Sequence, residues 1–168
     1  MITARLPRVV IGIAAIAAAL ISPTVAQAAT PAASDFFPIK NIATGECVQP
    51  QFDVESVLVS MPCTNTPAQR WVFDRNSNGN HIINQLTGFC IYMNGPVTSG
   101  SPVTQTSCST VTNNDWKVTP PPTVTTIMSR ASGRDTQLCI TPDPPGISEI
   151  LRILPCNGAL NQFWLIGL

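Results

Sequence analysis

The sequence predicts an all-β protein that is built from three copies of one four-stranded unit. Each tryptophan of the chain follows a cysteine by eight residues, and that cysteine follows another by 16 to 18 residues. A spacing that recurs three times indicates a repeat architecture. No segment shows a capped helical period over ten or more residues, and proline or glycine interrupts almost every gap between apolar runs. The three sets are Cys47, Cys63 and Trp71; Cys90, Cys108 and Trp116; and Cys139, Cys156 and Trp164.

The start of each unit predicts a hairpin. Residues 39–47 align without a gap on residues 82–90, and the third copy begins at 127–133 but carries four extra residues before Cys139. In each copy an apolar run meets a Thr-Gly or Ser-Gly turn, and a second run holds the cysteine, which is a hairpin pattern. Three such units give a closed β architecture of twelve strands with pseudo-threefold symmetry. The predicted strands are 37–42, 46–49, 57–61 and 70–74; 80–84, 89–93, 102–107 and 115–118; and 123–129, 137–141, 149–154 and 163–167, in repeats of about 36–78, 79–122 and 123–168.

The first 28 residues predict a secretory signal peptide. Arg5 and Arg8 form a basic region, residues 9–21 are an uncharged apolar run, and Ala26-Gln27-Ala28 is an A-x-A cleavage site. A membrane anchor needs about 20 apolar residues, and this run has 13. We therefore expect a secreted, extracellular protein with a signal peptide at 1–28, a flexible leader at 29–35, one domain at 36–168 and no membrane span in the mature chain.

The charge balance excludes nucleic acid as a partner. Without Arg5 and Arg8, the nine basic residues become 9 − 2 = 7 against 9 acidic residues, which is a formal charge of −2. The charged fraction is 11%, against about 25% in an average domain. Such a chain offers no basic face to nucleic acid, and neutral polar side chains must cover most of its surface.

All six cysteines lie in the predicted mature chain, and an even number in an exported protein indicates disulfides. Six cysteines allow 15 pairings, and the repeat favours the same local pairing in every unit. The alternative is a metal site, but these spacings are not those of zinc sites and His81 is the only histidine. We therefore expect no metal and no cofactor. The expected disulfides are Cys47–Cys63, Cys90–Cys108 and Cys139–Cys156.

The tryptophans also end Q-x-W triplets. Residues 69–71 are Gln-Arg-Trp, residues 162–164 are Gln-Phe-Trp, and residues 114–116 are a degenerate Asn-Asp-Trp. Together with the cysteine pairs, these triplets resemble the ricin-B-type lectin family over about residues 36–168. The resemblance implies a β-trefoil, a six-stranded barrel capped by three hairpins, and members of the family bind sugars. It also implies that Trp71, Trp116 and Trp164 pack in the core, while Gln69 and Gln162 form local hydrogen bonds.

Sugar sites of the family use three other positions, and this chain departs from them in every repeat. The family has an Asp two residues after the first cysteine, where this chain has Gln49, Tyr92 and Thr141. It has an aromatic residue two before the second cysteine, where Met61, Thr106 and Leu154 stand here. Directly before the triplet the family has Asn, and this chain has Ala68, Asn113 and Asn161. The resemblance therefore implies no sugar site in the first repeat and altered sites in the other two.

The second repeat keeps Asn113 and offers Tyr92 as a substitute stacking platform. The third keeps Asn161 and adds Asp143 just past the expected position, with Arg152 and Asn157 nearby. Asp143 also suits a turn, since it lies in a Pro-Asp-Pro-Pro-Gly stretch.

Three functions compete on this sequence. The favoured one is a secreted, non-catalytic, lectin-like module with a degenerate sugar site, whose partner is a glycan or cell-surface glycoconjugate. The alternative is a protein-interaction trefoil without sugar binding, resembling the ricin-like binding subunits of cytolethal distending toxins, with a protein as its partner. An enzyme is not expected, because no nucleophile elbow is present, His81 stands alone on a predicted strand and is interpreted as a surface residue, and the carboxylates are too scattered to pair.

Overall fold

We describe the fold from a computed structural model of the chain, in which residues 35–53, 55–75, 79–109, 111–119, 121–131 and 137–167 are described. The predicted signal peptide and all of the predicted leader except Asp35 lie outside these residues. The described residues contain strands and short 3₁₀ helices but no α-helix, so no helix among them is long and apolar enough to span a membrane.

The strands confirm the predicted all-β class. In the first repeat they are β1 (Phe37–Asn41), β2 (Cys47–Pro50), β3 (Leu58–Met61) and β4 (Arg70–Arg75). The second repeat has β5 (Asn80–Asn84), β6 (Cys90–Met93), β7 (Val103–Thr106) and β8 (Trp116–Lys117). The third has β9 (Thr123–Thr126), β10 (Met128–Ser129), β11 (Leu138–Pro142), β12 (Leu151–Pro155) and β13 (Phe163–Ile166).

One predicted strand is divided. Residues 123–129 form β9 and β10, which are separated at Ile127. The division coincides with a change of partners: β9 pairs with β13, whereas β10 pairs with β8 and β11. Ile127 itself is fully buried, and its carbonyl accepts a hydrogen bond from the Ile140 amide at 2.9 Å. The twelve predicted strands therefore appear as thirteen segments.

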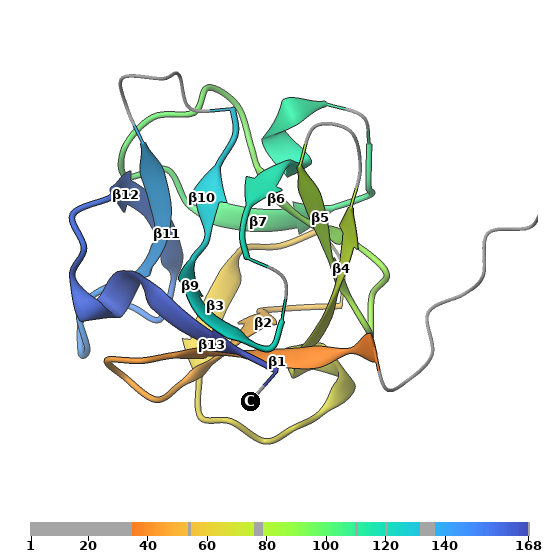
Figure 1. Ribbon diagram of the computed structural model, residues 1–168, viewed down its shortest axis with the longest axis horizontal. Helices are drawn as coiled ribbons and strands as arrows, with labels where there is room; N and C mark the ends of the chain where they lie inside the picture. The colour runs from red at the N-terminus through yellow and green to blue at the C-terminus, as the bar shows by residue number, and fades with distance from the viewer. Residues whose placement is uncertain are drawn as a thin grey trace, which may run out of the picture. The chain divides into compact units, whose positions relative to one another are not determined.

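A barrel and a cap make up the architecture (Figure 1). The barrel is a closed ring of antiparallel pairs, in which β1 joins β4, β4 joins β5, β5 joins β8, β8 joins β10, and β9 returns through β13 to β1. The pairs β2–β3, β6–β7 and β11–β12 form the three hairpins of the cap. This is the six-stranded, three-hairpin arrangement that the trefoil resemblance implies.

The three hairpins contact one another through equivalent backbone hydrogen bonds. We name the contact between the β2–β3 and β6–β7 hairpins seam 1–2, that between β6–β7 and β11–β12 seam 2–3, and that between β11–β12 and β2–β3 seam 3–1. Each seam has an isolated bridge: Val57 with Thr104, Pro102 with Arg152, and Ile150 with Val59. A backbone hydrogen bond accompanies each bridge: Gln105 N to Ser56 O (2.9 Å), Ile153 N to Ser101 O (3.0 Å) and Ser60 N to Glu149 O (2.7 Å).

The tryptophans anchor the core that all three repeats share. Trp71, Trp116 and Trp164 are fully buried, as expected. A buried indole N–H needs an acceptor, and each finds a carbonyl on the second strand of its own repeat. The indole nitrogens donate to Val48 O at 3.0 Å, Ile91 O at 3.0 Å and Ile140 O at 3.2 Å.

The first residue of each triplet ends a 3₁₀ turn, namely η2 (Pro67–Gln69), η3 (Thr112–Asn114) and η4 (Leu160–Gln162). Gln69 accepts from Thr64 N at 2.6 Å and donates to Pro62 O at 2.9 Å. Gln162 makes the equivalent bonds, from Asn157 N at 2.8 Å and to Pro155 O at 2.9 Å. Both glutamines therefore hold the loop after the second cysteine, as expected.

Asn114 is one methylene shorter than the glutamines. Its Nδ2 reaches Ser109 Oγ at 3.3 Å, and its buried Oδ1 has no partner among the described residues.

The three predicted disulfides are confirmed. Cys47–Cys63, Cys90–Cys108 and Cys139–Cys156 span 16, 18 and 17 residues, each within one repeat. Rings of this length stabilise a fold by about 3 kcal/mol each in the chain-entropy account. Each bond joins the start of a hairpin's first strand to the loop that its triplet glutamine or asparagine supports.

Candidate functional site

The three seams are lined by residues at equivalent positions of the three hairpins, but the side chains at these positions differ from one seam to the next. The residues four after the first cysteine and four before the second are Gln51 and Val59, Asn94 and Thr104, and Asp143 and Arg152. In every hairpin the second of these residues pairs across the strands with the position where the family has its Asp. The side chains at these positions therefore decide whether a seam is open or filled.

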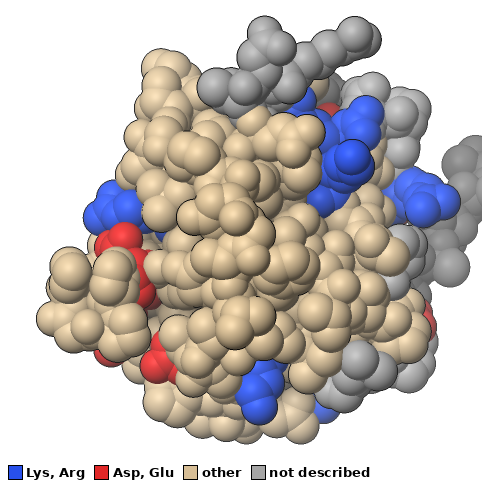
Figure 2. All heavy atoms as spheres, turned by 60° about the vertical axis from the view of Figure 1, so that its left-hand side comes forward, with Lys and Arg blue, Asp and Glu red and all other residues tan. Residues whose placement is uncertain are grey.

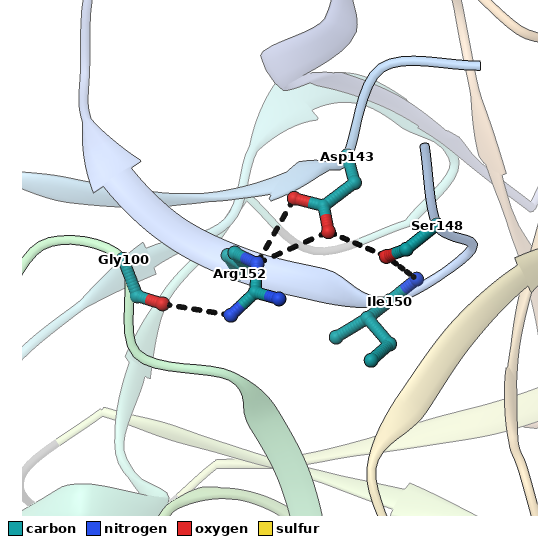
Figure 3. Close-up of polar contacts among 5 residues, drawn as sticks. All are labelled: Gly100, Asp143, Ser148, Ile150 and Arg152. Carbon is teal, nitrogen blue, oxygen red and sulfur yellow. Dashed lines mark hydrogen bonds and ion pairs between the residues drawn. The ribbon is translucent and has the colours of Figure 1, made fainter. Parts of the chain in front are cut away.

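Seam 2–3 is filled by an ion pair (Figure 3). Arg152 Nε donates to both carboxylate oxygens of Asp143 at 3.0 and 3.1 Å, and Arg152 Nη1 donates to Gly100 O on the neighbouring hairpin at 3.1 Å. Ser148 Oγ donates to Asp143 Oδ2 at 2.5 Å. The Asp143 side chain is only 13% exposed, so little of this carboxylate is left for a ligand.

The other third-repeat candidates lie apart from that pair. Asn157 is exposed, and its Oδ1 accepts from Ala159 N at 2.9 Å, as in a turn. Asn161 is half-buried in η4, where its backbone oxygen accepts from Asn41 Nδ2 at 2.9 Å. No hydrogen bond or ion pair between described residues links either asparagine to Asp143 or Arg152. The structure thus brings together two of the four candidates.

Seam 1–2 is open and forms a cleft of about 690 Å³. Tyr92, the ring at the family's Asp position, lines it from β6 and is half-buried. Its backbone oxygen accepts from Thr104 Oγ1 at 3.1 Å. Short hydroxyl and amide side chains surround the ring, so the cleft combines one aromatic surface with several neutral hydrogen-bonding groups. These polar residues are Ser56, Asn94, Thr104, Thr106, Ser107 and Ser109.

Asn113 does not line this cleft but bonds to the turn that follows β6. Its Nδ2 donates to Met93 O at 3.0 Å and to Gly95 O at 3.2 Å. These bonds fix the turn that follows β6 and therefore the neighbourhood of Tyr92. Of the two second-repeat candidates, Tyr92 lines the cleft and Asn113 holds its wall.

Glu55 is a cleft residue that the sequence comparison within single repeats missed. It belongs to the first repeat and lines the cleft from across seam 1–2, where its Oε1 accepts a hydrogen bond from Thr106 Oγ1. Thr106 stands where the family has its aromatic residue. Matching the repeats position by position considers each repeat alone, whereas Glu55 reaches the site only because two hairpins meet.

Seam 3–1 forms a smaller cleft of about 390 Å³ with a more apolar lining. Val59, Ile147 and Ile150 line it, and Ile147 is 75% exposed. Gln49, at the family's Asp position in this repeat, accepts from Gln69 Nε2 at 2.8 Å and so serves the scaffold. This cleft has no aromatic lining residue.

The expectation that His81 stands alone at the surface is wrong. Its Nε2 lies 3.3 Å from Oδ1 of Asp115, and the two side chains are 14% and 2% exposed. The pair could not be seen from the sequence, because its two residues are far apart in the chain. They meet only where β5 pairs with β8 in the closed barrel. Neither residue lines the seam 1–2 cleft. Within the described part of the chain, no three or more His, Cys, Asp or Glu side chains cluster as metal ligands would.

Charge is sparse on the surface. Figure 2 shows a face that is mostly uncharged, with a few small groups of basic and acidic residues towards its edges. Among the residues that line the seam 1–2 cleft, Glu55 is the only charged one. The cleft is therefore suited to an uncharged or cationic ligand.

Known structures share this fold. A designed threefold-symmetric protein, ThreeFoil, matches with a TM-score of 0.70 and 14% identity over 80% of this chain and 99% of its own. A ricin B-like lectin of Macrolepiota procera, solved with lactose, matches with a TM-score of 0.65 and 12% identity over 83% and 99% of the two chains. A cytolethal distending toxin structure from Actinobacillus actinomycetemcomitans matches with a TM-score of 0.62 and 17% identity over 80% and 91%.

Comparison with curated protein sequences gives no significant match. The family comparison is decisive, because the model of the ricin-type β-trefoil lectin domain matches residues 35–164. That match covers all three cysteine pairs and all three triplets described above. The chain therefore belongs to the ricin-type β-trefoil lectin domain family.

Proposed function

We propose that the protein is a secreted, non-catalytic carbohydrate-binding module whose sugar site is the cleft at seam 1–2. The observation that carries the proposal is Tyr92, a half-buried ring that lines a cleft of about 690 Å³ among neutral polar side chains. Ligand sites are commonly clefts of about 300–1,000 Å³ with a few placed polar groups. A sugar stacks its C–H face on a ring and offers hydroxyls to amides and hydroxyls, which is the set of groups present here.

The site is degenerate relative to the family because none of the three repeats has an Asp at the family's usual position, and the residues found there make other interactions. Gln49 and Thr141 Oγ1 both accept hydrogen bonds from triplet glutamines, at 2.8 and 3.1 Å. The third-repeat seam is occupied by Asp143 and Arg152. Only the second repeat combines an open cleft with an aromatic ring at that position.

Two features support secretion. The N-terminal segment has the charge and apolar pattern of a signal peptide. The three disulfides suit an oxidising compartment. Comparing the N-terminal sequence of the protein in cells and in medium tests the proposal, with cleavage after Ala28 as the expected result.

A glycan array with purified mature protein tests sugar binding, and Tyr92 variants test the site. We expect Tyr92→Ala to weaken binding of any captured glycan by tenfold or more, on the order of 1.4 kcal/mol, while Tyr92→Phe keeps the ring and most of the affinity. Ile147→Ala, at the seam 3–1 cleft, is the matched control and leaves binding unchanged. A stably folded protein that binds no glycan at millimolar concentration contradicts the proposal.

The protein-interaction function remains the second candidate, and the apolar lining of seam 3–1 favours it. Among the large hydrophobic residues that the structure describes, Ile147 is the most exposed, at 75%, and exposed apolar side chains beside a groove are typical of interaction sites. An affinity pull-down from the culture medium of the native source tests it. A partner that wild type captures and Ile147→Glu loses, without any glycan binding, would favour this function over the first.

A further inference from the structure

We propose that the glycan bound at seam 1–2 carries an amino sugar with a free ammonium group, and that Glu55 is the residue that selects it. This inference rests on the proposed function, because it assigns a substrate class to the same cleft. It goes beyond that function by identifying the charge of the ligand and by assigning specificity to a residue of a different repeat from the one that supplies Tyr92.

The first argument is the position of the carboxylate. Glu55 is exposed, lines the cleft, and faces the second-repeat hairpin across the seam. Thr106 Oγ1 donates to Oε1, which orients the carboxylate, while Oε2 has no hydrogen bond to any described residue. An oriented carboxylate with one free oxygen is an acceptor for an ammonium group.

The second argument is the absence of a competing cation. The lining residues of this cleft include no Lys, Arg or His, so none of them neutralises Glu55. An anionic sugar, such as a uronic or sialic acid, would meet a like charge without a counter-ion. A hexosamine with a free amine would gain a charge-assisted hydrogen bond, which is stronger than a bond from a neutral hydroxyl.

The third argument is the combination of Glu55 with Tyr92. The ring stands where the family has its Asp, and the carboxylate reaches the threonine that replaces the family's aromatic residue. Stacking and charge recognition are therefore both present, but each comes from an unexpected position. Because Tyr92 and Glu55 line the same cleft, we expect a pyranose stacked on the ring to present its amine to the free oxygen of Glu55.

The test compares three tetrasaccharides by calorimetric titration of the mature, oxidised protein at mildly acidic pH and low salt: glucosamine, N-acetylglucosamine and glucose oligomers. We expect the glucosamine oligomer to bind about tenfold more tightly than the acetylated one, since N-acetylation removes the charge. Because Glu55 is exposed, this advantage shrinks as salt screens the pair.

Variants assign the effect to the cleft. Glu55→Gln keeps an acceptor for Thr106 but removes the charge, and we expect it to abolish the advantage of the amine, so that the glucosamine and N-acetylglucosamine oligomers bind with similar affinity. Glu149→Gln is the matched control, since this exposed carboxylate lines the seam 3–1 cleft. Tyr92→Ala weakens binding of all three oligomers. Thermal unfolding confirms that each variant is folded.

The outcomes separate this inference from the proposed function. Equal or tighter binding of the acetylated or glucose oligomer, still dependent on Tyr92, overturns the amino-sugar inference and leaves the carbohydrate-binding function in place. An amine advantage that survives Glu55→Gln or disappears with Glu149→Gln also overturns it. Failure to bind all three oligomers, together with a silent glycan array, overturns both.

Discussion

Asn161 and Trp164 are three residues apart, and the structure gives them different roles. Trp164 is fully buried and donates its indole proton to Ile140 O, so it belongs to the shared core. Asn161 has its backbone engaged by Asn41, while its side chain makes no hydrogen bond to a described residue. The triplet motif is therefore mainly a marker of the fold, and a ligand role for Asn161 stays a prediction.

At the scale of single residues, the first residues of the triplets differ in how many hydrogen bonds they make to the loop after the second cysteine. Gln162 bonds at both ends of its amide, whereas the Oδ1 of Asn114 is buried without a partner among the described residues. We expect Gln162→Ala to lower the free energy of unfolding by about 2–3 kcal/mol, since it leaves buried groups unpaired, and Asn114→Ala by about 1 kcal/mol. Urea unfolding followed by tryptophan fluorescence measures both. Equal costs would show that the asparagine is as well satisfied as the glutamine.

At the scale of elements, the sequence predicts the bounds of a strand well where the strand continues without a break. The strand over 80–84 has the predicted bounds, and the one over 70–74 is longer by a single residue. The strand over 123–129 is divided at Ile127, where the pairing changes from β13 to β8 and β11. A change of partner depends on how distant parts of the barrel meet, and the local pattern of apolar residues does not record it.

The candidate site is likewise predicted only where its residues are recognised from nearby sequence, and not where they come from another repeat. The sequence predicts Tyr92 as a platform, because its offset from Cys90 is local. It does not reveal Glu55, which reaches the cleft across a contact between two repeats. Asp143 and Arg152 are predicted as ligand candidates. The pairing of β11 with β12 and the turn between them instead bring the two side chains into hydrogen-bonding contact with each other.

The third hairpin provides a test of which repeat binds sugar. Arg152→Ala removes the ion pair with Asp143 and the bond to Gly100 O. Because the arginine is 34% exposed, solvent screens the pair, and we expect a loss of about 1–2 kcal/mol of unfolding free energy. Urea unfolding measures this loss, and titration with a captured glycan should give an unchanged affinity. Loss of glycan binding in the folded variant would place the sugar site in the third repeat instead.

At the scale of the whole molecule, the closed barrel makes every repeat depend on the other two. β1 pairs with β13 and β4 pairs with β5, so strands from the two ends of the domain and from adjacent repeats complete one ring. In the cap, the seams likewise join each hairpin to the hairpins of the other two repeats. The cleft at seam 1–2 is a product of this closure, since neither the first nor the second repeat contains it alone.

The disulfides have a consequence for a nicked chain. Because each bond stays within its own repeat, no covalent bond other than the backbone joins one repeat to the next. A single proteolytic cut between Cys63 and Cys90 therefore yields two fragments that the barrel pairs hold together in native buffer. We expect size-exclusion chromatography to show one species of unchanged size, and a denaturing gel without reductant to show two. A single band on that gel would mean that a disulfide joins two repeats.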